Sequence, residues 1–231
     1  QMQYVPQHLQ PAGQASWPAL EGLSGELIFE GAGMRVRGGA ARVQGHPGWR
    51  FDGIEAEIAD FKHTDVVVQA QGRGALAAAL DIVRNSPVAQ FTHHALDAAR
   101  ASGDAALELK LELPVKTIEQ SKVQGRVLLA ANDLRLAPGA PPLAQAAGTV
   151  TFSGSGFAID KAQAQLLGGG VVVSGGTVKG AAAGAASVQV TARGNASAEG
   201  LRQSADWGAD WAAVAALARQ ASGSTAYEAV V

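Results

Sequence analysis

The sequence predicts a mainly β protein, built as an elongated, curved antiparallel sheet or open β-groove with two small helical inserts. The first observation is the alternation from Leu107 to Leu113, where four leucines share one face and Glu108, Lys110 and Glu112 share the other. Successive side chains of a strand point to opposite faces, so this stretch is a strand with one apolar and one wet face. The second observation is a series of short segments, separated by glycine turns, in which apolar and polar residues alternate. The third is the low aromatic content of 5% beside 29 glycines, which favours thin sheets.

The first part of the chain is expected to pass from an extended segment into the groove. Residues 1–22 contain three prolines and several glutamines, which favours extended backbone. The groove follows over 23–198. Alternation predicts its first strands at 26–30, 34–37, 40–44, 54–58 and 64–70. We expect a break at 46–48, where the sequence is His-Pro-Gly.

The first helical insert is expected at about 74–101. Leucine and valine at helical spacing in an alanine-rich stretch predict a helix over 75–84, which Pro87 ends. A second short helix is expected over 92–100, with Thr92 as its cap.

Short strands separated by glycines resume after Pro114 and predict an antiparallel meander. Their expected ranges are 123–129, 134–136, 149–152, 156–159, 162–167, 171–173 and 187–190. Residues 199–231 are expected to form a C-terminal helical segment, with helices over 199–203 and 211–220, that leads into a truncated strand. Residues 227–231 have the pattern of a strand that opens without continuing, so we expect a piece of a longer protein.

Composition argues against several classes of protein. A net charge of −2 lacks the basic footprint of a nucleic-acid binder, so no nucleic-acid partner is expected. The chain contains no cysteine, which excludes disulfides and thiolate metal sites. No run of about 18 apolar residues predicts a transmembrane helix, and the first residues lack the pattern of a signal peptide.

No motif predicts catalysis, and we expect no enzyme activity, no cofactor and no metal. His93 and His94 are adjacent, and adjacent helical residues point about 100° apart, so they form a poor metal-binding pair. Asp97 lies at i+4 from His93 and leaves a weak metal or acid–base alternative to a solvated helix start. The glycines at 168–170 lack the Lys-Ser/Thr and the helix of a phosphate loop, so we expect a tight turn there.

A set of short motifs occurs in a recognisable order along the chain. They are WPALE at 17–21, LSGELIFEG at 23–31, MRV at 34–36, DIVRNSP at 81–87, SG at 102–103 before the leucine strand 107–114, VQGRV at 123–127, ANDLRL at 131–136, GTVTF at 148–152 and LLGG at 166–169. Their order and spacing resemble the middle of the YhdP family, large AsmA-like envelope proteins of Gram-negative bacteria. The resemblance covers roughly residues 14–180 and weakens beyond.

The resemblance implies properties that composition does not predict. Proteins of this kind, which are similar in design to TamB, are anchored in the inner membrane by an N-terminal helix and extend through the periplasm. They look like bridge-type lipid transfer proteins, whose long β-groove carries phospholipid toward the outer membrane and supports its barrier. By this resemblance we expect a periplasmic, non-enzymatic segment without the anchor. Its expected partners are phospholipid acyl chains and the remaining repeats of the same chain.

An uncharged aliphatic face would give acyl chains a water-free path, since charge would raise the barrier to sliding. The residues expected to line it are Val66, Val68, Leu107, Leu109, Leu111, Leu113, Val127, Leu129, Val150, Phe152, Val171 and Val173. The same residues could instead form an ordinary core against the helix at 75–84 or against a second sheet. Two other functions stay open: a structural spacer without a lipid track, and a β scaffold that binds proteins by strand addition. Unpaired edge strands would also let the chain associate with itself.

Overall fold

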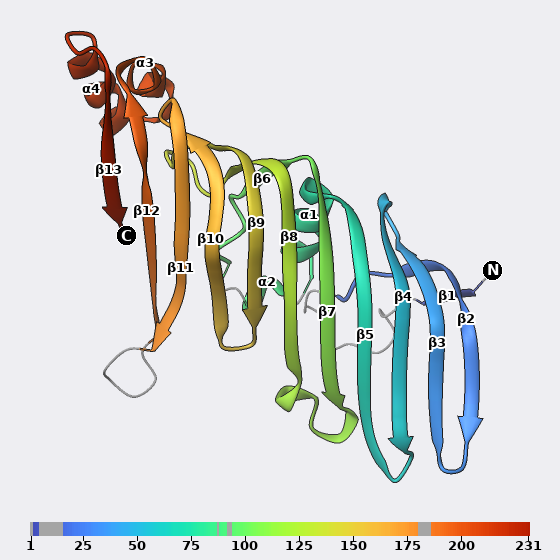
Figure 1. The fold of residues 1–231 in the computed structure, drawn as a ribbon. Coiled ribbons are helices and arrows are strands. Elements are labelled where there is room, and N and C mark those ends of the chain that lie inside the picture. The colour runs from blue at the N-terminus through green and yellow to red at the C-terminus, as the bar shows by residue number, and fades with distance from the viewer. Residues whose placement is uncertain (1, 5–15, 87, 92–93, 180–185) are drawn as a thin grey trace.

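The structure of this chain is a computed structural model that describes residues 2–4, 16–86, 88–91, 94–179 and 186–231. The described residues form one open antiparallel sheet, with most of the helices gathered at one end of its strands (Figure 1). The prediction of an elongated, mainly β fold with two small helical inserts is confirmed.

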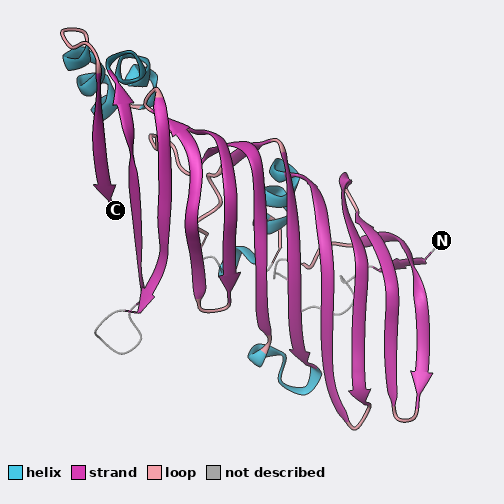
Figure 2. Cartoon of the chain, viewed as in Figure 1, coloured by secondary structure: helices cyan, strands magenta, loops and turns pink. Residues whose placement is uncertain are grey.

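The described residues contain thirteen strands, and nearly every strand pairs with the strands that precede and follow it in the chain (Figure 2). The strands are β1 (Met2–Tyr4), β2 (Leu20–Glu30), β3 (Gly33–Val43), β4 (His46–Asp60), β5 (His63–Ala75), β6 (Arg100–Ser102), β7 (Asp104–Pro114), β8 (Lys122–Arg135), β9 (Leu143–Ser153), β10 (Gly156–Leu166), β11 (Gly169–Lys179), β12 (Ala186–Ser197) and β13 (Ser224–Val230). The helices are α1 (Leu76–Arg84), α2 (Val88–Phe91), η2 (Val115–Gln120), α3 (Ala198–Gln203), η3 (Ser204–Trp207) and α4 (Ala209–Ala218). Only β6 lies off the main path, because it pairs with β8 beside the start of β7.

The strands are longer than the sequence pattern predicts, because several expected ends are β-bulges inside one strand. The predicted strands 34–37 and 40–44 are both parts of β3, whose register with β4 shifts beside Gly38, a residue with φ 58°. Likewise, 156–159 and 162–167 fall largely in β10, with a register shift after Ile159. A bulge adds one residue to a strand and bends it without ending the ladder.

Two sequence-based predictions of local structure are wrong. The expected break at 46–48 lies inside β4, and the turn is at 44–45 instead. The second helix of the first insert is α2, which lies before the expected range of 92–100. The hydroxyl of Ser86 accepts a hydrogen bond from the first amide of α2 (3.3 Å) and therefore takes the capping role predicted for Thr92. Thr92 itself lies outside the described residues.

The registers of the ladders sort the side chains onto two faces, because paired residues of antiparallel strands point to the same side. One row runs through Leu27, Val36, Ala56, Val68, Leu111 and Val123. A second row runs through Phe51, Gly72, Leu107, Val127, Val150, Ile159, Gly175 and Val190. We call the side that bears these rows the apolar face, and the other side the charged face.

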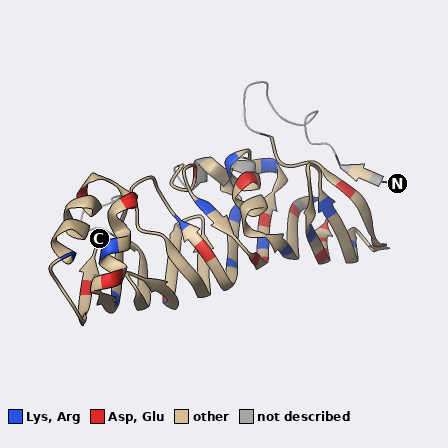
Figure 3. Ribbon diagram, turned by 90° about the horizontal axis from the view of Figure 1, so that it is seen from above, with Lys and Arg blue, Asp and Glu red and all other residues tan. Residues whose placement is uncertain are grey.

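The core lies at one end of the apolar face, where the helical inserts cover it. α1 packs against β4 and β5 there, and Trp49 beneath it is only 2% exposed. The second insert, from α3 to α4, contributes Trp207 to a cluster formed by Ala146, Ala164, Leu166, Val171 and Val173. Seen from above, α1 lies on one side of the sheet (Figure 3). Toward the opposite end of the strands, the described chain places no second layer over the face.

Candidate functional site

The structure places all twelve predicted lining residues on the apolar face. Ten of them, from Val66 to Phe152 in the chain, are partly exposed. The other two, Val171 and Val173, are 2% and 9% exposed and belong to the covered core cluster. These two valines therefore fit the alternative in which the predicted lining residues form an ordinary core. The ten others form a surface that water can reach.

The lining residues of β5, β7, β8 and β9 are contiguous. Val68 is paired with Leu111, and Leu107 is paired with Val127 across the next ladder. The ring of Phe152 lies over Gly125, since a Cβ atom added to that glycine would be 2.5 Å from the ring Cζ. Side chains from neighbouring strands therefore lie side by side over the backbone in this part of the apolar face.

Sequence reasoning missed part of this face. Leu27 and Phe29 on β2 are 55% and 66% exposed, and Val188 on β12 is 56% exposed. Leu27 and Phe29 pair with Val36 and Met34 of the apolar face. Val188 pairs with Thr177 and lies on the same side of β12 as Val190. The alternation at 26–30 was a usable signal for the first two. Bulges in the strands between β2 and β7 change the alternation, so the sequence pattern does not predict that Leu27 and Phe29 lie on the same side of the sheet as the leucines of β7.

Four ion pairs between neighbouring strands lie on the opposite face. Cross-strand ion pairs there are Arg35–Glu57 (2.8 Å), Arg73–Asp52 (2.6 Å), Arg126–Glu108 (2.7 Å) and Arg193–Glu228 (2.9 Å). Such exposed pairs contribute little net stability because water screens them. They do show which face is solvated, and the two rows named above contain no Asp, Glu, Lys or Arg.

Two of the glutamates on the charged face have a lowered pKa. Lys110, through its hydrogen bond and its charge, lowers the pKa of Glu112, and Lys122 adds to the effect. Arg193 lowers the pKa of Glu228 in the same way. Both carboxylates therefore keep their charge to a lower pH than an isolated glutamate does.

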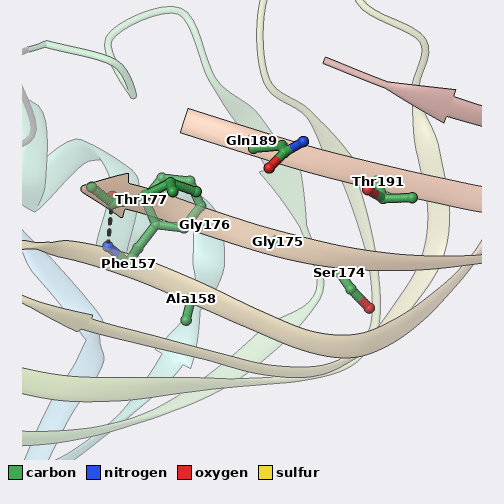
Figure 4. A pocket seen from close by; sticks show the side chains of 9 residues that line it. Phe157, Ala158, Ser174, Gly175, Gly176, Thr177, Gln189 and Thr191 are labelled. Carbon is green, nitrogen blue, oxygen red and sulfur yellow. Dashed lines mark hydrogen bonds between the residues drawn. The ribbon is translucent and has the colours of Figure 1, made fainter. Parts of the chain in front are cut away.

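A hollow of about 390 Å³ lies around the glycine pair of β11 (Figure 4). It is lined by Phe157, Ala158, Ser174, Gly175, Gly176, Thr177, Val178, Gln189 and Thr191. The Thr177 hydroxyl accepts a hydrogen bond from the Phe157 amide (3.1 Å). None of the lining side chains titrates near neutral pH, so this hollow offers no general acid or base.

The histidines do not form a metal site in the part of the chain that the structure describes. No group of three or more His, Cys, Asp or Glu side chains gathers there as metal ligands. His94 Nδ1 lies 2.8 Å from Asp97 Oδ2, and both side chains are exposed. His93, the other member of the predicted alternative, lies outside the described residues. A membrane-spanning helix is not found among the described residues, whose longest helix, α4, has ten.

Comparison with known proteins identifies a family. No curated protein and no solved structure matches the chain at a significant level. A family model described as YhdP protein matches residues 8–231, which is nearly the whole chain. This match extends beyond the range over which the ordered motifs resemble that family. The chain belongs to the YhdP family.

Proposed function

We propose that this chain is a non-enzymatic segment of a bridge-like lipid transfer protein of the bacterial envelope. It would move phospholipid between the inner and outer membranes and support the barrier of the outer membrane. Membership of the YhdP family is consistent with envelope proteins of the lipid-transport type. The observation that carries the proposal is the partly exposed aliphatic face whose two rows, both without Asp, Glu, Lys or Arg, together cross the sheet from β2 to β12.

The geometry of this face suits an acyl chain better than a compact ligand. The two rows together cross the ten strands from β2 to β12 that lie on the main path. Neighbouring strands lie about 4.8 Å apart, so the face extends for roughly 43 Å. Exposed apolar surfaces of this extent mark binding sites for apolar partners. An acyl chain that moves along the rows exchanges one set of aliphatic contacts for an equivalent set. The phosphate head group can stay in water beyond the strand ends, so it need not be desolvated.

In this proposal the segment lies in the periplasm as part of a protein anchored in the inner membrane. Its partners are phospholipid acyl chains and the other repeats of the same protein. Neither a cofactor nor a metal takes part. The two faces have separate roles, since the apolar face holds the lipid and the charged face stays in water.

The test is site-specific crosslinking in the full-length protein in its cells. A photoreactive benzophenone side chain replaces Leu109 on the apolar face or, as the control, Lys110 on the charged face of the same strand. Mass spectrometry should find phospholipid adducts at position 109 and none at position 110. A lack of adducts at 109, or equal adducts at both positions, would contradict the lipid track.

The covered cluster around Val171 favours a second candidate, a structural spacer. There the second insert fills the apolar face, as a protein core would. A spacer predicts that crosslinked lipid is absent at every position, while the envelope phenotype depends only on the length of the sheet.

A further inference from the structure

The buried side chains of the sheet all lie toward one end of its strands. We call this the insert end, because the segments 76–103 and 198–223 connect strands there. We call the other the turn end, where short turns such as 61–62 and 154–155 connect strands (Figure 1). Within the described chain, every buried strand side chain lies in the half of its strand next to the insert end. Examples on different strands are Val43, Trp49, Ala105, Ala146 and Val171.

Toward the turn end the apolar face is open. Leu27 and Phe29, near that end of β2, are 55% and 66% exposed, and Val188 near that end of β12 is 56% exposed. On β7 the four leucines from Leu107 to Leu113 are partly exposed. They span roughly 20 Å at about 3.4 Å per residue. The hydrocarbon core of a bilayer is about 30 Å thick, so the acyl chains of one leaflet occupy about 15 Å. An acyl chain therefore fits along the open part of a strand.

A phospholipid that lies along a strand must place its head group at one of the two ends. At the insert end the head group would meet buried apolar side chains and the inserts that cover them. Burial of a charged group without a partner costs free energy. At the turn end the same group stays in water. The cover over the insert end therefore favours one direction of the lipid.

Two lysines lie together at the turn end. Lys62 is in the turn between β4 and β5, and Lys116 is in η2, which follows β7. Lys116 Nζ donates a hydrogen bond to the backbone oxygen of Lys62 (3.1 Å), so the two turns are adjacent. Asp60 accepts a hydrogen bond from the Lys62 amide (2.8 Å) and lies 3.7 Å from His63. Among the side chains that the structure describes, neither lysine ammonium has an ion-pair partner.

Each of these lysines follows an exposed apolar residue. Phe61 and Val115 are 46% and 56% exposed. Beside them lies the pair of Val66 and Leu113, near the turn end of the ladder between β5 and β7. Along this edge the surface changes from aliphatic to cationic, as a phospholipid changes from acyl chain to phosphate. A lysine ammonium is a point charge that binds phosphate groups.

We propose that Lys62 and Lys116 bind the phosphate of a phospholipid whose acyl chains lie along β5 and β7 and point toward the insert end. This assignment rests on the lipid track proposed above and adds a fixed direction of the lipid within it. As the lipid passes from strand to strand, its head group stays at the turn end.

The test uses two photoreactive phospholipids with the purified full-length protein. One carries a diazirine on its head group and the other carries it at the end of an acyl chain, and peptide mass spectrometry locates each label. The head-group probe should label residues 60–63 and 114–117, and the acyl-chain probe should label the strand around Leu107. Head-group label at the turn 44–45 of the insert end, as strong as at 60–63, would overturn the direction. Acyl-chain label on the sheet would still support the lipid track in that case. If neither probe labels the sheet, both proposals fail.

A double variant tests the two lysines themselves. Lys62→Gln combined with Lys116→Gln should lower labelling by the head-group probe at the turn end about fivefold, the effect of one exposed ion pair at the upper end of its range. Labelling by the acyl-chain probe around Leu107 should stay unchanged. The control is Lys161→Gln, which removes an exposed lysine from β10 and should change neither label. Circular dichroism checks that both variants keep their sheet. Unchanged head-group labelling in the double variant, or an equal loss in the control, would overturn the role of the two lysines.

Discussion

Placing the same carboxylate at two positions of the apolar face separates a solvent-accessible surface from a core. The substitutions are Leu109→Asp and Val171→Asp. Leu109 is partly exposed, and its partners in register are Ala70 and Gly125, so little side-chain bulk surrounds it. Val171 is 2% exposed under the second insert. We expect the first variant to fold and the second to unfold.

The expected magnitudes follow from burial. Full burial of a leucine is worth about 1.5–3 kcal/mol, and a partly exposed one retains roughly half of that. At position 109 the carboxylate can also keep water contacts, so the expected loss is about 1–2 kcal/mol of an unfolding free energy of about 5–15 kcal/mol. At position 171 the lost contacts add to the desolvation of an unpaired charge. Such changes cost more than about 4 kcal/mol.

Urea unfolding followed by tryptophan fluorescence measures both variants. The control is Gln69→Asp, which adds a carboxylate on the charged face of β5 opposite Lys110 and should leave stability nearly unchanged. Equal destabilisation by the two apolar-face variants would mean that a second layer covers Leu109, and the reasoning would be refuted. If Leu109→Asp folds, the same variant in the full-length protein should lose lipid transfer.

Three further predictions concern single positions of the sheet. Ala131 has φ 60°, a left-handed conformation that costs non-glycine residues about 1–2 kcal/mol. Ala131→Gly should therefore raise the free energy of unfolding by up to about 1 kcal/mol, as measured by urea unfolding. Gly125→Ala should lower it by about 1–3 kcal/mol, because the new Cβ would meet the Phe152 ring at 2.5 Å, and thermal unfolding would detect this. Lys110 lowers the pKa of Glu112 in the folded state. The pair therefore stabilises the fold above the pKa that Glu112 has in the unfolded chain, about 4.3, and this stability is lost as the pH falls through the lower pKa of the folded state. Glu112→Gln should remove this pH dependence and so flatten the acid limb of the stability–pH curve.

The fold class could be predicted because the alternation of apolar and polar residues depends only on the sequence of each strand. Leu107 to Leu113 shows both faces of a strand without any knowledge of its neighbours, and the structure pairs that strand as expected. Strand lengths and registers could not be predicted. They depend on bulges at residues such as Ala131, Gln145 and Lys161, which have positive φ although they are not glycine. Nothing in the type of these residues indicates that conformation.

The site was partly predictable for the same reason. Alternation placed Val66 and Leu109 on apolar sides of their strands, and the registers then brought these sides together. The burial of Val171 depends on Trp207, which lies far along the chain in a separate insert. A pattern of period two cannot indicate that a later helix folds back over one end of the sheet.

The order of the strands has a consequence for how the protein unfolds. Since almost every ladder joins segments adjacent in the chain, the sheet resembles a linear array whose stability is a sum of nearest-neighbour couplings. Local opening of one hairpin can then stop at the next strong coupling, because each hairpin depends mainly on its neighbours. A change in one hairpin could therefore leave the registers of the more distant ladders as they are.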